Sequence, residues 1–154
     1  IEECLIEELD QKEKYWIDAV SEYKKRLSRF AEVEVKEVSE FSGNSKISIE
    51  KIKELECEEL LKKLSGFVVA MDKDGEQLTS EGFAKFIDET YLKGVKNITF
   101  LIGGSNGLTK EIIHKANKTI SFGKITFPHQ LMRVVLIEQI YRAETILNNI
   151  SYHK

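Results

Sequence analysis

The sequence predicts an α/β fold in which helices cover both faces of a parallel sheet. Two apolar runs, Gly66–Met71 and Asn97–Ile102, show no alternation of apolar and polar residues, which is typical of strands buried on both faces. Segments with helical spacing alternate with these strands along the chain. With 154 residues, of which 42% are hydrophobic and 32% charged, the chain has the size of one compact domain. We therefore expect a single domain over residues 1–154.

The first half of the chain contains two predicted helices and a short strand. Over Lys12–Phe30, apolar residues recur at three and four positions and predict an amphipathic helix with the inner face Trp16, Ala19, Val20, Tyr23, Leu27 and Phe30. Val33–Val38 alternates apolar and charged residues as a half-buried strand does. Ser, Gly and Asn residues mark a loop over Phe41–Ser48. A second helix is expected from about Ser48 to Leu64, with the inner face Ile49, Ile52, Leu55, Leu60 and Leu64.

The middle of the chain carries the two buried strands. Gly66–Met71 leads into a polar turn over Asp72–Leu78 that contains the pair Asp74 and Gly75. Thr79 or Ser80 can cap the next helix, whose predicted buried face carries Phe83, Ile87 and Tyr91. Asn97–Ile102 then forms the second buried strand.

The C-terminal third predicts a further strand and a long helix. A glycine-rich loop, Gly103–Gly107, precedes a short helix that ends near Asn117. Thr119–Phe122 is a strand candidate, and a long helix runs from about Pro128 to Asn149. Proline suits the first position of a helix, because that position needs no backbone N–H donor.

The first eleven residues do not fit this pattern of buried strands. They contain acidic pairs, and the spacing of Ile1, Leu5 and Leu9 favours a helix. Pairing with a neighbouring strand could override that local preference, so the sequence leaves both structures open for this segment.

Charge and cysteine content limit the classes of function. The net charge is −3, but residues 103–154 hold seven Lys or Arg against three Asp or Glu, whereas residues 1–102 hold 16 against 23. A basic C-terminal third suggests an anionic partner there. Cys4 and Cys57 lack the spacing of metal or redox motifs, so we expect reduced thiols and no metal. No apolar run approaches the roughly 20 residues that would span a membrane.

Three loops follow predicted parallel strands, after Met71, Ile102 and Phe122. Ligands of α/β sheets bind beyond the carboxyl ends of the strands, so these loops are the candidate binding site. The loop Gly103–Gly107 could let the backbone approach a ligand, or it could be an ordinary tight turn. Its glycine spacing differs from the dinucleotide-binding pattern, and no lysine-bearing phosphate loop is present, which disfavours NAD and ATP chemistry.

Several longer segments resemble one enzyme family. The chain is similar to the RlmH family, SPOUT-class enzymes that use S-adenosylmethionine to methylate N3 of a pseudouridine in large-subunit (23S) ribosomal RNA on assembled ribosomes. The similarity lies in Leu101–Gly107, Ser121–Ala143 and Tyr152–Lys154, and it extends back through Leu78–Gly82 and Lys12–Trp16.

The resemblance implies a fold and partners that periodicity alone does not indicate. It implies a SPOUT-type domain with a C-terminal trefoil knot, in which residues 97–154 form the knotted, cofactor-binding part. It also implies a homodimer that acts on ribosomal RNA, in the cytoplasm that the reduced cysteines indicate. By the same resemblance, S-adenosylmethionine contacts Met71, Gly103, Phe122, Gly123, Lys124, Ile125, Thr126 and Phe127. For Met71 and Phe122, plain core packing is the alternative.

Four residues are candidates for catalysis, and a fifth, Arg133, is a candidate for substrate contact. His129 lies at the start of the last helix, where the helix dipole disfavours the imidazolium form, so it is a candidate general base. Tyr152 and His153, at the end of the chain, could reach the substrate base or a neighbouring subunit. Arg142 and also Arg133 could contact phosphate or base.

Each of these candidates has a plainer alternative. His129 could merely cap or pack its helix, Arg142 could pair with Glu138 four residues earlier, and Arg133 could lie on a solvated helix face. For the whole chain, the alternative is a non-catalytic dimeric ribosome-binding module that retains the knotted fold.

Overall fold

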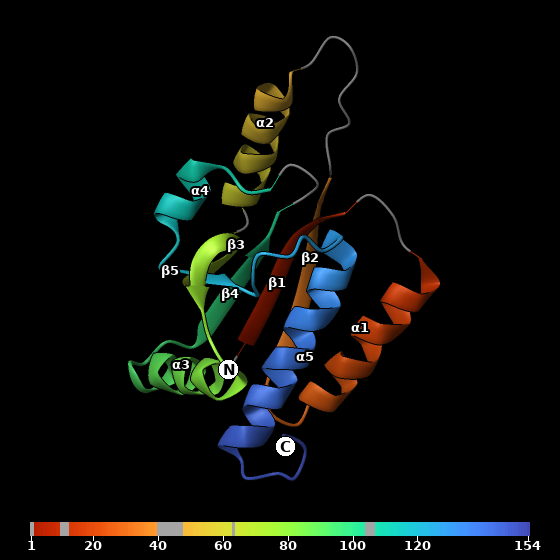
Figure 1. Ribbon diagram of the computed structural model, residues 1–154, viewed down its shortest axis with the longest axis vertical. Coiled ribbons are helices and arrows are strands. Elements are labelled where there is room, and N and C mark those ends of the chain that lie inside the picture. The colour runs from red at the N-terminus through yellow and green to blue at the C-terminus, as the bar shows by residue number, and fades with distance from the viewer. Residues whose placement is uncertain (1, 10–12, 40–47, 63, 104–106) are drawn as a thin grey trace.

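Strands and helices alternate along the chain in the computed structural model, which confirms the predicted α/β class (Figure 1). The structure describes residues 2–9, 13–39, 48–62, 64–103 and 107–154. The strands are β1 (Glu2–Leu9), β2 (Glu32–Ser39), β3 (Phe67–Gln77), β4 (Asn97–Ile102) and β5 (Lys118–Ser121). The helices are α1 (Lys14–Leu27), α2 (Ile49–Leu61), α3 (Ser80–Leu92), α4 (Lys110–Lys115) and α5 (His129–Leu147). The loop expected over Phe41–Ser48 lies outside the described residues except for Ser48.

The strands form one parallel sheet in the order β2-β1-β4-β3-β5. Because each neighbouring pair is parallel, all of the strands leave the sheet at the same edge. The loops after β4 and β5 therefore emerge on the side toward which β3 also runs. This common edge is where the sequence places its candidate site.

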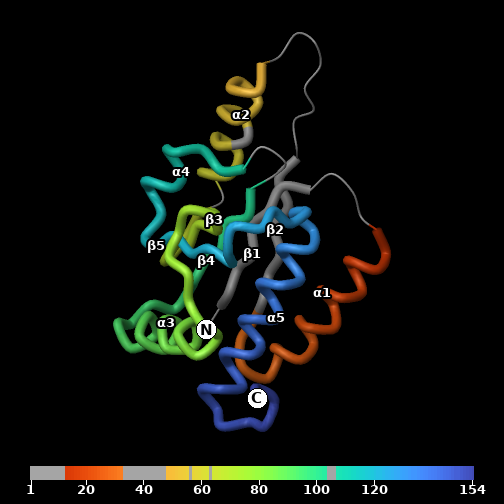
Figure 2. The backbone as a smooth tube through the Cα atoms, in the orientation of Figure 1, coloured from red at the N-terminus to blue at the C-terminus, as the bar shows by residue number. Residues whose placement is uncertain are grey.

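Helices pack on both faces of the sheet, as predicted. On one face, α5 lies between α1 and α3 (Figures 1 and 2) and packs with Ile98, Phe100 and Ile102 of β4. On the other face, α2 and α4 pack against Leu101 of β4 and Ala70 of β3. Successive residues of β4 thus point into different cores, which explains its unbroken apolar sequence.

Side chains that cap helices mark several helix boundaries. The hydroxyl oxygens of Ser48, Thr79 and Thr109 accept hydrogen bonds from backbone N–H groups in the first turns of α2, α3 and α4. The sequence left the cap of α3 open between Thr79 and Ser80, and the structure selects Thr79. Pro128 is the N-cap of α5, so the helix begins at His129, one residue later than predicted. Among the described residues, no helix combines the length and apolar character of a membrane-spanning segment.

The helical spacing at the start of the chain is misleading, because Glu2–Leu9 forms strand β1. This strand lies inside the sheet and pairs over eight residues with β2 and over six with β4. Its backbone N–H and C=O groups form hydrogen bonds with the strands on both sides. In an isolated helix the same groups would form hydrogen bonds within the helix. Tertiary pairing therefore overrides the local spacing of Ile1, Leu5 and Leu9.

The predicted inner face of α2 is wrong at its first residue. Ile52 and Leu60 are buried as expected, but the side chain of Ile49 is 63% exposed. In Figure 1 the N-terminal end of α2 extends beyond the body of the sheet, so its first residue precedes the packed part of the helix. Cys57, on the same helix, is buried with a free thiol, and the side chain of Cys4 lies outside the described residues.

The segment predicted as a turn after Met71 continues as part of β3. The strand pairs Met71 with Ile120, leaves the ladder over residues 72–75, and then pairs Glu76 again with Ile120. A Cβ atom at Gly75 would lie 2.8 Å from backbone atoms of Ile120 and Thr119. Glycine therefore allows the returning chain to lie against β5, while the bulge projects at the edge of the sheet.

We predict that Gly75→Ala destabilises the protein by about 1–3 kcal/mol, because the added methyl group overlaps backbone atoms that cannot rotate away. Urea unfolding at neutral pH measures this change. Lys85→Ala, at an exposed position of α3, is the control and should leave the free energy of unfolding nearly unchanged. An unfolding midpoint of Gly75→Ala equal to that of the parent chain would contradict this account.

Candidate functional site

A pocket of about 920 Å³ lies at the edge of the sheet where β3, β4 and β5 end. The bulge of β3 contributes Met71, Asp72 and Lys73, and the end of β4 contributes Ile102 and Gly103. The segment after β5 contributes every residue from Phe122 to Pro128, and the first turn of α5 adds His129, Gln130 and Met132. Three segments that are distant in the sequence thus share one concave surface, as expected of parallel α/β sheets.

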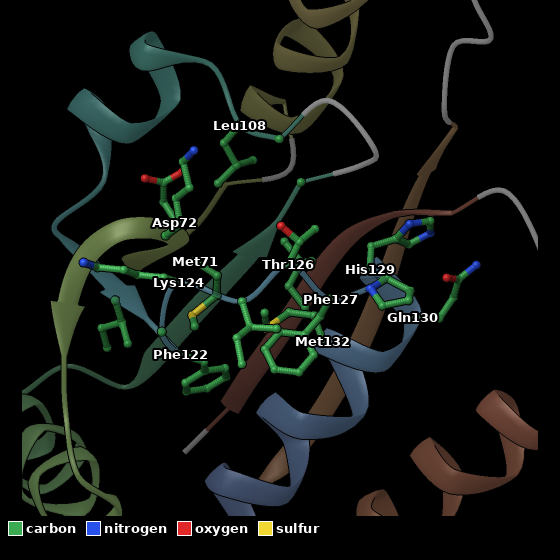
Figure 3. Close-up of a pocket in the computed structure, with 18 of the residues that line it drawn as sticks. Met71, Asp72, Leu108, Phe122, Lys124, Thr126, Phe127, His129, Gln130 and Met132 are labelled. Atoms are coloured by element: carbon green, nitrogen blue, oxygen red, sulfur yellow. The ribbon is translucent and has the colours of Figure 1, made fainter.

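All eight residues predicted to contact a cofactor line this pocket. They are Met71, Gly103, Phe122, Gly123, Lys124, Ile125, Thr126 and Phe127. Figure 3 shows Met71, Phe122, Phe127 and Met132 grouped around the middle of the site, with Lys124 and Asp72 at one end and His129 and Gln130 at the other. Met71 and Phe122 also pack on the main core, so for these two side chains core packing and pocket lining coincide.

The segment after β5 is held in place by a local turn. The hydroxyl oxygen of Ser121 accepts a hydrogen bond from the Gly123 N–H at 3.0 Å and donates one to the Gly123 carbonyl at 3.1 Å. Gly123 has a φ of 108°, in a region that side chains with a Cβ atom rarely adopt. The buried Ser121 and the permissive Gly123 together direct Lys124, Ile125 and Thr126 outward along the rim.

At Gly103 the backbone after β4 packs closely against a later part of the same loop. A Cβ atom at Gly103 would lie 2.7 Å from the carbonyl carbon of Gly107 and 2.8 Å from the backbone nitrogen of Leu108. Leu108 is buried and itself lines the pocket. The absence of a side chain at Gly103 therefore allows the chain to return and form this wall.

Sequence reasoning missed several residues of the lining. Asp72 and Lys73 follow the predicted strand directly, so their position at a strand end was a usable signal. Lys53 comes from α2, and its sequence surroundings give no sign that it reaches the site. With Lys53, Lys73 and Lys124 against Asp72, the charged groups of the lining are predominantly positive. Among the described residues, no three His, Cys, Asp or Glu side chains are grouped to hold a metal ion.

The other three predicted catalytic residues lie together at the far end of α5, and none of them lines the large pocket. We call Glu138, Arg142, Tyr152 and His153 the C-terminal cluster. Glu138 Oε1 accepts hydrogen bonds from Arg142 Nη2 at 2.7 Å and from the Tyr152 hydroxyl at 3.2 Å. The ion pair expected as the alternative role of Arg142 is therefore present, and hydrogen bonding to Glu138 raises the pKa of Arg142.

His153 connects the cluster to α3. Its Nε2 lies 2.7 Å from Glu81 Oε1, and its Nδ1 lies 3.1 Å from Arg142 Nη1. Because arginine only donates hydrogen bonds, Nδ1 must accept, and the ring proton then lies on Nε2, where it reaches the carboxylate. The same hydrogen bond lowers the pKa of Glu81. His129, by contrast, lies at the opposite end of α5 in the large pocket.

Arg133 does not lie on the solvated helix face that was its alternative role. Its residue surface is only 4% exposed, and it lies on the same helix as the core residues Leu136 and Ile137. It also does not line the large pocket. The buried guanidinium is a feature that helical periodicity did not indicate.

Comparison with known proteins defines the class to which this fold and pocket belong. A family model described as "Predicted SPOUT methyltransferase" matches residues 5–153. The chain therefore belongs to the SPOUT methyltransferase family. Among its curated relatives is "Ribosomal RNA large subunit methyltransferase H" of Streptococcus pneumoniae strain CGSP14, which is 46% identical over 148 residues and 93% of each chain. The same protein of strain TIGR4 matches equally well.

Solved structures of low sequence identity share the fold. A probable methylase family protein from Haemophilus influenzae Rd KW20 is 15% identical, with a TM-score of 0.57 over 99% of this chain and 70% of that one. The putative methyltransferase Lpg2936 from Legionella pneumophila, solved with bound SAM, is 11% identical, with a TM-score of 0.53 over 93% of this chain and 66% of that one.

We predict that the Tyr152 hydroxyl makes stability fall at high pH. Burial, reinforced by the Glu138 carboxylate, raises the pKa of Tyr152 from 10.0 to about 12. The folded state then keeps a proton that the unfolded state loses, so this contribution is complete below pH 10 and disappears as pH rises toward 12. The free energy of unfolding should therefore fall less steeply over this range in Tyr152→Phe than in the parent chain.

Tyr15→Phe serves as the matched control for Tyr152→Phe, because Tyr15 is 62% exposed. Its pH dependence should equal that of the parent chain. Equal slopes for all three proteins between pH 10 and 12 would show that Tyr152 does not titrate as described.

Proposed function

We propose that this protein methylates N3 of a pseudouridine in large-subunit (23S) ribosomal RNA on assembled ribosomes, with S-adenosylmethionine as methyl donor. The observation that carries the proposal is the convergence of Met71, Gly103 and residues 122–127 on one pocket at the sheet edge. Membership of the SPOUT methyltransferase family and the names of the pneumococcal relatives support the reaction and the RNA substrate.

The residues of the large pocket fit S-adenosylmethionine. Met71, Phe122, Phe127 and Met132 offer apolar and aromatic contacts for an adenine ring. Gly103 leaves room that a Cβ atom would fill, so backbone groups can approach a ligand there. When bound, the cofactor supplies a methyl group activated by a sulfonium centre.

The protein's tasks in this reaction are positioning and removal of a proton. The new N3–methyl bond forms as the sulfur–methyl bond breaks, and the N3 proton must pass to a base. We assign that role to His129, which lines the pocket at the first residue of α5. The positive end of the helix dipole disfavours the imidazolium form and so keeps the ring able to accept a proton.

Arg142, Tyr152 and His153 are proposed to contact the RNA. They are not in the lining of their own chain's pocket, so we assign them to the substrate, either beside that pocket or in a neighbouring subunit. Arg142 and Tyr152 are already oriented by Glu138, which lowers the entropic cost of using them.

The proposal includes a homodimer and the trefoil knot of the family, formed by residues 97–154 of a single domain. On α5, Leu136, Ile137 and Ile140 are buried in the chain's own core, while Leu131, Val134 and Val135 remain half-buried. Burial of this second apolar face against another copy would be favourable. A dimer would also join two basic C-terminal thirds into one surface for RNA, in the cytoplasm where ribosomes are found.

Gly103→Val is predicted to abolish binding of S-adenosylmethionine in isothermal titration calorimetry, because its side chain would displace Gly107 and Leu108 from the pocket wall. Lys85→Ala is the control, since Lys85 is exposed on α3 and does not line the pocket. Thermal unfolding of both variants shows whether they are folded. Normal affinity in a folded Gly103→Val protein would contradict the assigned pocket.

Ribosomes that lack the modification, incubated with methyl-labelled S-adenosylmethionine, should acquire label in the large-subunit RNA. Reverse transcription should then stop at the modified base, because a methyl group on N3 blocks pairing. His129→Ala should slow transfer by about 10²- to 10⁴-fold while cofactor affinity stays nearly unchanged. His114→Ala, at an exposed histidine of α4 outside the pocket lining, is the matched control and should leave transfer nearly unchanged.

Two results would revise the proposal. Unchanged turnover in His129→Ala would show that His129 is not the base. Ribosome binding by the parent chain without label or reverse-transcription stop would favour the non-catalytic ribosome-binding module instead.

A further inference from the structure

The C-terminal end of α1 carries a concentration of positive charge that the net charge of residues 1–102 does not show. Residues 24–29 hold four cations and no carboxylate, although residues 1–102 as a whole are acidic. All four cationic residues are exposed, and we call them the basic end of α1: Lys24, Lys25, Arg26 and Arg29. Cations in a last turn complement the helix dipole, which explains part of this charge. The dipole does not explain how Arg26 is held.

The guanidinium of Arg26 lies over two tyrosine rings. Its Cζ is 5.4 Å from the ring centre of Tyr23 on the same helix and 5.8 Å from that of Tyr141 on α5. Its Nε donates a hydrogen bond to Glu22 Oε1 at 3.0 Å, and the side chain stays 42% exposed. Of the residues that the structure describes, none accepts a hydrogen bond from its two terminal nitrogens. The planar group is therefore held in place while these nitrogens remain free to donate to an external anion.

The same tyrosines join the basic end of α1 to the C-terminal cluster. The rings of Tyr141 and Tyr152 pack edge to face, with 4.8 Å between their centres. Arg142 Cζ lies 4.8 Å from the ring centre of Tyr152. Two guanidinium groups thus flank one group of aromatic rings, Arg26 from α1 and Arg142 from α5. Figure 1 shows the last turns of these two helices side by side, near the C-terminus of the chain.

The chemistry of this surface fits the phosphate backbone of a nucleic acid strand. An arginine fork binds a phosphate through two parallel hydrogen bonds. The tyrosine rings are covered by guanidinium groups, so they orient the arginines, and the contact carries no base sequence. The cations are exposed and spread over two helices, which suits the repeating phosphates of a strand better than one small anion. The proposed dimer does not require this surface, because the apolar residues assigned to a second copy lie in the first half of α5: Leu131, Val134 and Val135.

We propose that Arg26, with Lys24 and Lys25 beside it, binds backbone phosphates of the ribosomal RNA and extends the RNA contact of the C-terminal cluster onto α1. This assignment rests on the proposed function, because it names a further part of the surface that receives the same RNA. Arg26 acts away from the reacting atoms. It therefore strengthens RNA binding equally before and during methyl transfer, which lowers KM and leaves kcat unchanged.

The test separates RNA affinity from catalysis. Arg26→Gln removes the charge and keeps much of the side-chain stem. It is compared with the parent chain for the Kd of ribosomes that lack the modification, and for kcat and KM of methyl transfer to them. We expect Kd and KM for ribosomes to rise about 3- to 10-fold, while kcat and the Kd of S-adenosylmethionine stay within about twofold of the parent values.

Salt dependence is the readout that a merely structural role would not move. Between about 50 and 200 mM salt, the slope of log affinity against log salt concentration should be smaller in magnitude by about one in Arg26→Gln, because one phosphate contact is lost. Arg26→Lys keeps the charge and should keep the slope of the parent chain. The double variant Lys24→Gln/Lys25→Gln leaves the contacts of Arg26 with the rings in place and should also reduce the slope.

Lys62→Gln is the matched control. Lys62 is also an exposed cation at the C-terminal end of a helix, and it pairs at 3.0 Å with Glu59 of that helix, α2. Because α2 packs on the opposite face of the sheet from α1 and α5, this variant removes the same charge away from the proposed surface. Its Kd for ribosomes and its salt slope should equal those of the parent chain, and thermal unfolding shows whether all variants are folded.

Each failure gives a distinct result. An unchanged Kd and salt slope in Arg26→Gln, or a loss of affinity that does not depend on salt, would overturn the proposal and leave the proposed function intact. A loss with intact ribosomes but not with protein-free large-subunit RNA would also overturn it, since a ribosomal protein would then be the partner. A parent chain that binds ribosomes through Arg26 but transfers no methyl group would overturn the proposed function and not the assignment of this surface.

Discussion

The parallel pairing of β3, β4 and β5 is the constraint on which the site depends. Parallel strands deliver their following segments to one edge of the sheet, so Met71, Gly103 and Phe122 come together although they are far apart in sequence. Two close backbone contacts at glycine residues make this arrangement possible. Gly75 lies against the backbone of β5, and Gly103 lies against Gly107 and Leu108. Any side chain at these two positions would separate the walls of the pocket.

Helix α5 connects the parts of the molecule to which we assign different ligands. Its first turn lines the large pocket, its middle packs in the core, and Glu138 and Arg142 on it form the C-terminal cluster with the end of the chain. Because one rigid helix carries all three, the distance from His129 to Arg142 along the chain is fixed. This separation of sites along α5 suits the proposed enzyme, which must bind a small cofactor at one end of the helix and a large RNA along the rest of the surface.

Much of the candidate site could be predicted because it depends on local sequence. The loops after strands were visible as Gly-containing polar segments behind apolar runs, and the family resemblance supplied eight of the residues that line the large pocket. The contribution of Lys53 could not be found this way. It arises because α2 reaches the pocket at the sheet edge, and no single segment of sequence encodes such a contact.

The sequence by itself determined the alternation of strands and helices, the doubly buried character of β4 and the glycines required by tight backbone contacts. These properties follow from the period of apolar residues and from the steric limits of each residue. Only the tertiary structure decided that Glu2–Leu9 is a strand, since ladders to β2 and β4 outweigh a local helical spacing. It also decided that Arg133 is buried and that Arg142, Tyr152 and His153 gather away from His129. Burial and long-range hydrogen bonding depend on which elements meet, and periodicity within one element carries no information about its neighbours.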